Sequence, residues 1–217
     1  GPYVLDQYTR GTQITHKKNP NYWNKGLPYL DALKTMIVPD PNTRAAAFRT
    51  GQIHIFGATA SEFESLKKEL GDKASYESGG SLGFGALYIN TTHKPYDNPK
   101  VREALNLVVS RQDAIQVVQQ GDALVGGYMR PGGPWSLPEE EILKMPGFAK
   151  DKTKDLERAK QLMAEAGLGS GYEVQLITRQ SQSYIDLSIF FADQLKKLGI
   201  KATVKPYETT QAYDLAY

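Results

Sequence analysis

The sequence predicts an α/β fold that contains βαβ units, and two observations carry this prediction. Strand-like and helix-like segments alternate from about residue 33 to the end of the chain. The run from residue 173 to residue 205 reads as strand, helix and strand, with lengths that fit a parallel crossover. The 217 residues are 40% hydrophobic and 23% charged, the ordinary balance of a globular protein that buries a core.

In the first part of the chain, strands and short helices are expected in turn. Residues 33–38 predict a strand, and a turn rich in proline and aspartate follows it and ends it. Residues 43–49 predict a short helix and residues 53–56 a second strand. Residues 61–70 predict a second helix, and a glycine closes each of the two helices.

The middle of the chain contains the clearest helix start. A strand is expected over residues 86–90, and then Asn98 offers a helix cap ahead of Pro99 in the first turn. Ser110 begins a motif that resembles a capping box and predicts another short helix. Glycine and proline crowd residues 126–138, which predicts a long loop.

Regular patterning returns in the last third of the chain. An apolar face repeats at helical spacing over residues 155–166, and a strand is expected over 173–178. A second helical stripe covers residues 184–198, and a strand follows over 200–205. Residues 213–217 read as the start of one more strand.

Bulk properties exclude several function classes. The net charge of +2 is too small to indicate nucleic acid as a partner. The sequence contains no run of 18 apolar residues, so no transmembrane helix is predicted. Cysteine is absent, which rules out disulfides, thiolate metal ligands and cysteine nucleophiles in this chain. His16, His54 and His93 do not have the spacing of metal ligands.

One motif suggests an enzyme. Residues 79–83 fit G-x-S-x-G, the nucleophile elbow of α/β hydrolases, with Ser81 as the nucleophile. That elbow needs a strand before it and a helix after it, whereas here a strand is expected after it. The only downstream histidine is His93, and no acid is positioned between the two. A flexible turn is the simpler interpretation, so we expect no catalysis and no cofactor, with a hydrolase using Ser81 as the alternative.

Six ordered segments resemble the family 5 extracellular solute-binding proteins, which are the dipeptide, oligopeptide and nickel binders of ABC importers. The matching segments are Gly1-Pro2-Tyr3 with Asn19-Pro20-Asn21-Tyr22-Trp23; Leu27-Pro28-Tyr29-Leu30-Asp31; Ile37-Val38-Pro39-Asp40-Pro41-Asn42 with Ala45 to Ile53; Asn90-Thr91-Thr92 with Pro95 to Asn106; Ala159 to Gly167; and Leu198 to Ala202. Any one alone would be weak, but their order over nearly the whole chain makes the resemblance specific.

The resemblance implies the type II periplasmic binding protein fold, with a partial first lobe over residues 1–85 and most of the second lobe over residues 86–217. Family members are longer, so we expect further segments before Gly1 and after Tyr217. The implied function is capture of a peptide or similar small solute in an inter-lobe cleft, for an ABC permease. The implied location is periplasmic or extracellular, at the membrane through the permease or a lipid anchor outside this chain. A fragment without binding activity of its own is the other alternative.

The best site candidates are Arg179, Gln180, Ser181, Ser183 and Tyr184, which fill the loop after the strand 173–178. Ligands of open α/β sheets lie beyond the carboxyl ends of strands. The helix that follows presents backbone N–H groups that favour an anion, and the arginine suits a carboxylate. The resemblance agrees, because the matching loop of dipeptide binders supplies an arginine and a tyrosine to the ligand. This stretch departs from the family's usual proline-containing sequence, however. In the alternative, the arginine is a solvated loop charge and the tyrosine belongs to the helix stripe.

A second candidate is the loop that contains Tyr128 and Trp135. It resembles the family's proline-rich loop near the cleft, and aromatic faces on a loop fixed by proline can hold a ligand. In the alternative, Trp135 packs the loop onto its own lobe.

Overall fold

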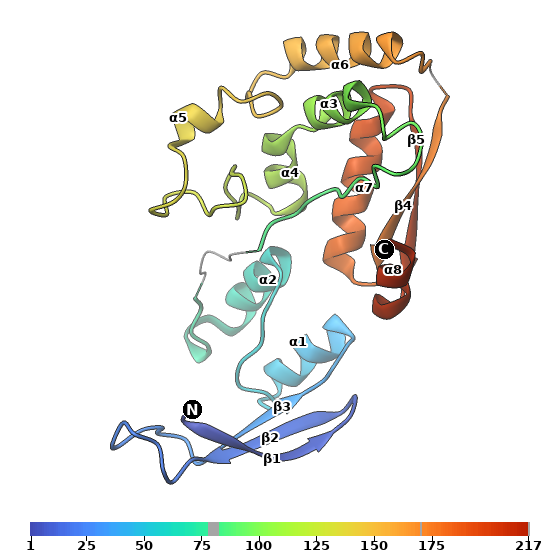
Figure 1. Cartoon of the computed structure of the whole chain (residues 1–217). Helices are drawn as coiled ribbons and strands as arrows, with labels where there is room; N and C mark the ends of the chain where they lie inside the picture. Colours follow the sequence, from blue (N-terminus) through green and yellow to red (C-terminus); the bar gives the residue numbers. More distant parts are fainter. Residues whose placement is uncertain (78–82, 170, 217) are drawn as a thin grey trace. The chain divides into compact units, whose positions relative to one another are not determined.

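The computed structural model describes residues 1–77, 83–169 and 171–216, and the chain divides into two compact units, Gly1–Tyr76 and Glu77–Tyr217 (Figure 1). The division into lobes at residues 85 and 86 stays a prediction. In the described part of the chain, no helix has both the length and the apolar character needed to cross a membrane.

The first unit contains an antiparallel three-stranded sheet in the order β1-β2-β3. Its elements are β1 (Tyr3–Thr9), β2 (Gln13–Lys18), β3 (Ala32–Met36), α1 (Pro41–Arg49), α2 (Ala60–Leu70) and the 3-10 turn η1 (Gly71–Lys73). The hairpin β1–β2 was not predicted from the sequence. Its register shifts between Leu5 and Gln7, which places a bulge at Asp6 and breaks the period-two alternation that reveals a strand.

Local hydrogen bonds fix the starts of the two helices of this unit. The Asp40 carboxylate accepts from the backbone N–H and the hydroxyl of Thr43, and these bonds lower the pKa of Asp40. Thr59 and Glu62 form a capping box at the start of α2. Both helices were predicted, and both are confirmed, with α1 beginning slightly earlier than expected.

The expected strand over residues 53–56 is wrong. The N–H groups of Gln52 and Ile53 both donate to the carbonyl oxygen of Ala47, so this segment begins as the turn that closes α1. Ile55 is 91% exposed, and the segment pairs with no strand within the described residues. Its short apolar pattern therefore does not mark a buried strand.

The second unit is built around a βαβ unit, as predicted. Its elements are α3 (Pro99–Val108), α4 (Arg111–Val118), α5 (Glu139–Ile142), α6 (Thr153–Glu165), β4 (Glu173–Arg179), α7 (Gln182–Lys196), β5 (Lys201–Tyr207) and α8 (Thr209–Ala216). Strands β4 and β5 pair in parallel, and their register runs from Glu173 opposite Lys201 to Arg179 opposite Tyr207. The irregular loop expected over residues 126–138 is confirmed.

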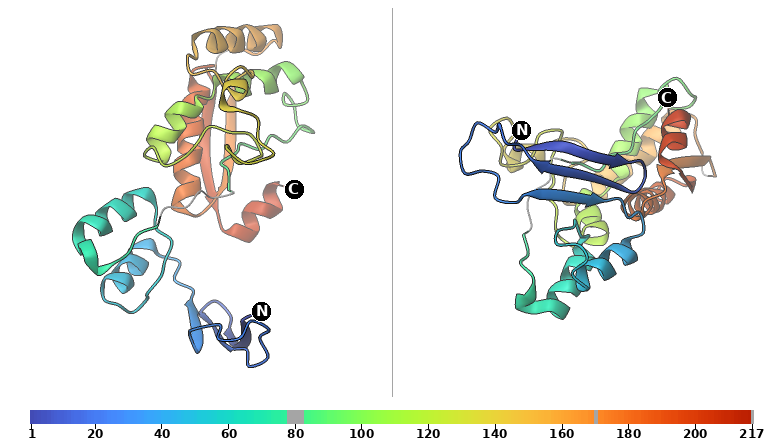
Figure 2. Two further views of the ribbon diagram at one scale, coloured as in Figure 1. Left: turned by 90° about the vertical axis from the view of Figure 1, so that its left-hand side faces the viewer. Right: turned by 90° about the horizontal axis from the view of Figure 1, so that it is seen from below.

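The core of this unit lies where α3, α6 and α7 meet the β4–β5 pair (Figures 1 and 2). Apolar residues at helical spacing on three helices point to one another, which gives each helix its buried stripe. Leu162 and Val101 are the largest side chains that are almost completely buried. The core comprises Val101, Ala104, Leu105, Leu107, Val108, Val109, Ala159, Leu162, Met163, Phe190, Phe191, Leu195, Leu198 and Ile200.

Two further strand predictions are wrong. Residues 86–90 form no strand; Leu87 and Ile89 instead pack their side chains against the core, which accounts for their alternation. Residues 213–216 belong to α8, while residue 217 lies outside the described residues. The N–H of Ala212 donates to the carbonyl of Glu208 and its side chain is buried, so a helical turn follows β5 directly.

Candidate functional site

The site candidates lie at the carboxyl edge of the parallel pair. Arg179 and Tyr207 form the last matched pair of β4 and β5, and α7 and α8 begin just beyond them. Figure 1 shows α8 beside these strand ends. The N–H of Gln180 donates to the carbonyl of Tyr207 at 2.7 Å, which extends the ladder by one residue and fixes the backbone of the loop.

Arg179 lies close to two tyrosine rings. Its guanidinium carbon lies 3.8 Å from the ring centroid of Tyr184 at the start of α7 and 5.6 Å from that of Tyr213 on α8. Both distances are in the range of cation–π attraction. The arginine is half-buried, and among the residues that the structure describes its side chain makes no ion pair and no hydrogen bond. A partly buried cation thus retains its N–H donors for another group.

The first turn of α7 supplies backbone donors beside this cation. Ser181 is the N-cap residue, but its hydroxyl makes no capping hydrogen bond. The N–H groups of Tyr184 and Ile185 return to the carbonyl of Ser181, while the N–H groups of Gln182 and Ser183 lie at positions without an intrahelical acceptor. The N-terminus of a helix carries a positive electrostatic potential, and the guanidinium of Arg179 adds a positive charge beside it. This edge of the sheet therefore favours an anion.

The structure brings together some of the predicted residues and adds one. Arg179 and Tyr184 are in contact, and Ser181 and Ser183 lie in the adjoining helix start, where they are exposed. Tyr213 was missed, because residues 213–217 were expected to form a strand. The sequence offers no signal for this contact, because it depends on how α8 packs against β4 and β5.

The other candidate loop is separate from Arg179. Tyr128 and Trp135 are 81% and 83% exposed. The ring of Tyr128 packs edge-on against Phe84, with their centroids 5.3 Å apart. In Figure 1 this loop lies between α4 and α5, away from α8. Trp135 therefore does not pack the loop onto its own unit, and its ring face is accessible.

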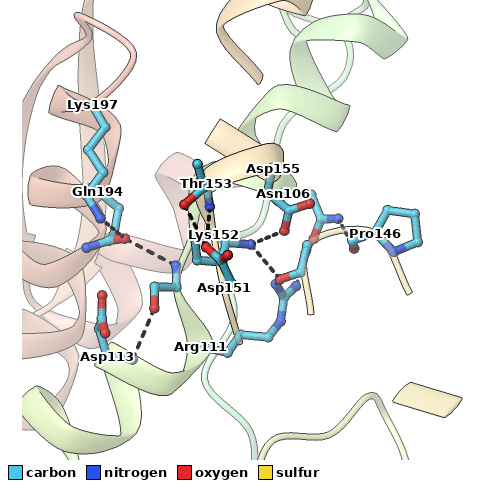
Figure 3. A network of polar contacts seen from close by, with 12 residues as sticks. Asn106, Arg111, Asp113, Pro146, Asp151, Lys152, Thr153, Asp155, Gln194 and Lys197 are labelled. Atoms are coloured by element: carbon cyan, nitrogen blue, oxygen red, sulfur yellow. Dashed lines mark hydrogen bonds and ion pairs between the residues drawn. The ribbon is translucent and has the colours of Figure 1, made fainter. Parts of the chain in front are cut away.

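A polar network elsewhere in this unit has a structural role (Figure 3). Arg111 donates to the carbonyl of Gly147 and, at 2.8 Å, to the side-chain oxygen of Asn106, and its guanidinium stacks 3.8 Å over the ring of Phe148. Lys152 also donates to Gly147. Burial lowers the pKa of Lys152 and that of Arg111, against the opposing effect of a nearby carboxylate. Every group is used within the fold, so the network anchors the segment before α6.

Two other predictions concern catalysis and metals. Ser81, the nucleophile of the hydrolase alternative, lies outside the described residues. Within residues 1–77, 83–169 and 171–216, no group of histidine, aspartate and glutamate side chains is arranged to hold a metal ion.

Comparison with known proteins identifies the family. The whole chain, residues 1–217, matches the family described as bacterial extracellular solute-binding proteins, family 5 middle. Di/tripeptide-binding protein 1 of Pseudomonas aeruginosa (strain UCBPP-PA14) is 31% identical over 96% of this chain and 38% of its own length. Glutathione-binding protein GsiB of Shigella flexneri serotype 5b is 32% identical over 97% of this chain and 40% of its own length.

Solved structures agree on the fold. The periplasmic binding protein DppA of Helicobacter pylori, in complex with the peptide STSA, is 28% identical with a TM-score of 0.74, over 98% of this chain and 39% of that one. AgaA of Agrobacterium tumefaciens R10, in complex with agropinic acid, is 27% identical with a TM-score of 0.71, over 100% of this chain and 43% of that one.

The match over the whole chain and the likeness in fold define this chain as part of a solute-binding protein. The chain belongs to the family 5 bacterial extracellular solute-binding proteins. The type II periplasmic binding protein fold expected from the resemblance is confirmed. The chain spans about two fifths of the length of the curated relatives it matches.

Proposed function

We propose that this chain supplies part of the solute site of an ABC-importer binding protein, and that Arg179 pairs with a carboxylate of a peptide-like solute. The observation that carries the proposal is the arginine itself. It is half-buried, stacked on Tyr184 and without an acidic partner in the described part of the chain. A planar guanidinium suits bidentate pairing with a carboxylate.

The relatives support this chemistry. By their names, they bind dipeptides, tripeptides or glutathione, and one solved neighbour holds agropinic acid. Peptides, glutathione and an organic acid share a carboxyl group, although they differ in size and in their other groups. A site that recognises the carboxylate would accept this range, and contacts elsewhere would select among the solutes.

The partner and the location follow from the same family. We infer that the full-length protein delivers its solute to an ABC permease and that it works in the periplasm or outside the cell, held at the membrane by the permease or a lipid anchor. The family's description as extracellular supports this location. The two lobes, residues 1–85 and 86–217, are part of the same proposal.

Arg179→Ala in the full-length protein is expected to weaken binding of a dipeptide such as L-alanyl-L-alanine by roughly ten- to a hundredfold. The reason is the loss of charge-assisted hydrogen bonds, each of which contributes about 1.5–3 kcal/mol. Isothermal titration calorimetry measures the change. The C-terminal amide of the same dipeptide should be affected much less, because it offers no carboxylate.

Arg10→Ala is the matched control, since Arg10 is an exposed arginine in the turn between β1 and β2. It should leave both affinities within about twofold, as surface substitutions do. Equal binding of the acid and the amide by the unsubstituted protein would rule out carboxylate recognition. Binding by the full-length protein but not by residues 1–217 alone would show that the fragment lacks an activity of its own.

Trp135 gives an independent test of the second candidate loop. Its indole is 83% exposed, so a solute that covers it should shift its emission to shorter wavelength. We expect this blue shift in the full-length protein on addition of a bound dipeptide, and we expect it to vanish in Trp135→Phe. Identical emission changes in the two proteins would remove Trp135 from the solute site.

A further inference from the structure

We propose that Tyr213 is a positioning residue for Arg179, which together with Tyr184 orients the guanidinium toward the carboxylate of the solute. This inference rests on the proposed function, in which Arg179 is the carboxylate partner. It adds a residue from α8, which follows β5, to a site otherwise formed by the loop between β4 and α7.

The stacking geometry limits where Arg179 can donate. The guanidinium carbon lies over the ring of Tyr184, 3.8 Å from its centroid, which is van der Waals contact. Tyr213 approaches the same group from α8 at 5.6 Å. A guanidinium donates its hydrogen bonds in its own plane. Among the described residues the two rings do not take up these donors, whose planar arrangement matches the two oxygens of a carboxylate.

The fold holds Tyr213 in this place. Strand β5 ends at Tyr207, opposite Arg179, and α8 starts at Thr209, so the helix begins next to the arginine. Ala212 is buried and α8 contacts both strands, which anchors the helix against the pair. Tyr213 itself is 47% exposed, so part of its ring faces solvent while it approaches the cation.

An arginine that is already oriented loses less side-chain freedom when a solute binds. Arginine has several rotatable bonds, and immobilising such a side chain weakens binding. The attraction of a guanidinium to a partly exposed aromatic ring is modest. Its loss corresponds to a change of about two- to fivefold in the affinity for the solute. Tyr213 should therefore tune the recognition of the carboxylate without being indispensable for it.

The test compares Tyr213→Leu and Tyr213→Phe in the full-length protein. Calorimetry gives the affinity for L-alanyl-L-alanine and for its C-terminal amide, and the ratio of the two is the readout. Tyr213→Leu should lower this preference for the acid by about two- to fivefold, and Tyr213→Phe, which retains the aromatic ring, should restore it. Tyr88→Leu is the matched control, because Tyr88 is 79% exposed and lies outside α8.

A second measurement needs no solute. In NMR spectra of the full-length protein, ring currents should shift the Hε proton of Arg179, whose signal is identified by its loss in Arg179→Lys. Tyr213→Leu should move this signal, and Tyr213→Phe should leave it close to its original place. An unmoved signal in Tyr213→Leu would overturn the positioning role whether or not the dipeptide binds.

The outcomes separate the two proposals. If Arg179→Ala abolishes the preference for the acid and Tyr213→Leu leaves it intact, only the role of Tyr213 fails. If Arg179→Ala itself leaves the preference unchanged, or if neither form of the dipeptide binds, the carboxylate function fails and the role of Tyr213 in it falls too. A general loss of stability would weaken the acid and the amide equally and would also count against positioning.

Discussion

Leu162→Ala is expected to destabilise the protein by about 2–5 kcal/mol, because it removes the Cγ atom and both Cδ atoms from the centre of the core and leaves a cavity. Leu162 is 1% exposed and lies on α6 where that helix meets α3. Its neighbours Ala104 and Ala159 are also fully buried, and such small side chains cannot move in to fill the cavity. Urea denaturation followed by circular dichroism measures the loss.

Leu124→Ala is the control for this substitution. Leu124 is 69% exposed in the loop after α4, so the same chemical change there should alter the free energy of unfolding by less than about 0.5 kcal/mol. Similar effects at the two positions would mean that α6 does not pack on α3 in the way described.

Arg111→Ala is expected to destabilise the protein by about 2–4 kcal/mol. It removes charge-assisted hydrogen bonds to the carbonyl of Gly147 and to Asn106, together with the stack on Phe148. Gly147 has a φ of 86°, and a β-carbon there would lie 2.7 Å from the carbonyl oxygen of Asn106. The segment therefore approaches α3 closely, and Arg111, like Asn106 and Lys152, donates to its backbone carbonyls.

Limited proteolysis localises this effect. In Arg111→Ala the segment between α5 and α6 should be cut faster, because local opening exposes it before the rest of the unit unfolds. Arg111→Lys keeps the charge but not the planar stack or the two-pronged donation, so it should show an intermediate rate. Cleavage as slow as in the unsubstituted protein would contradict the anchoring role of the network in Figure 3.

The helix starts could be predicted from the sequence because the groups that stabilise them are close neighbours. Asn98 accepts a hydrogen bond from the N–H of Lys100, and Ser110 accepts one from the N–H of Asp113. A cap and its partner lie within three residues, so no distant contact is needed to form the bond. The parallel crossover was predictable for a related reason, since its two strands and its helix follow one another directly.

The wrong predictions all concern segments whose secondary structure depends on contacts with segments that are distant in the sequence. Residues 53–56 and 86–90 have apolar patterns that suit a strand, but neither finds a neighbouring strand to pair with among the described residues. The hairpin β1–β2 was missed because its bulge at Asp6 interrupts the alternation. Strand formation needs ladder hydrogen bonds from a second segment, and a single short pattern does not say whether that segment exists.

The sequence by itself determined the family, through its ordered motifs, and it placed Arg179 and Tyr184 in one loop at the end of a strand. Only the tertiary structure decided that Tyr213 belongs with them. From the sequence, residues 213–217 were expected to start a strand, whereas in the structure residues 213–216 belong to α8, which packs against β4 and β5 with Ala212 buried. That helix carries a second ring to the arginine across a separation of 34 residues, a contact that arises because parallel strands end at the same edge.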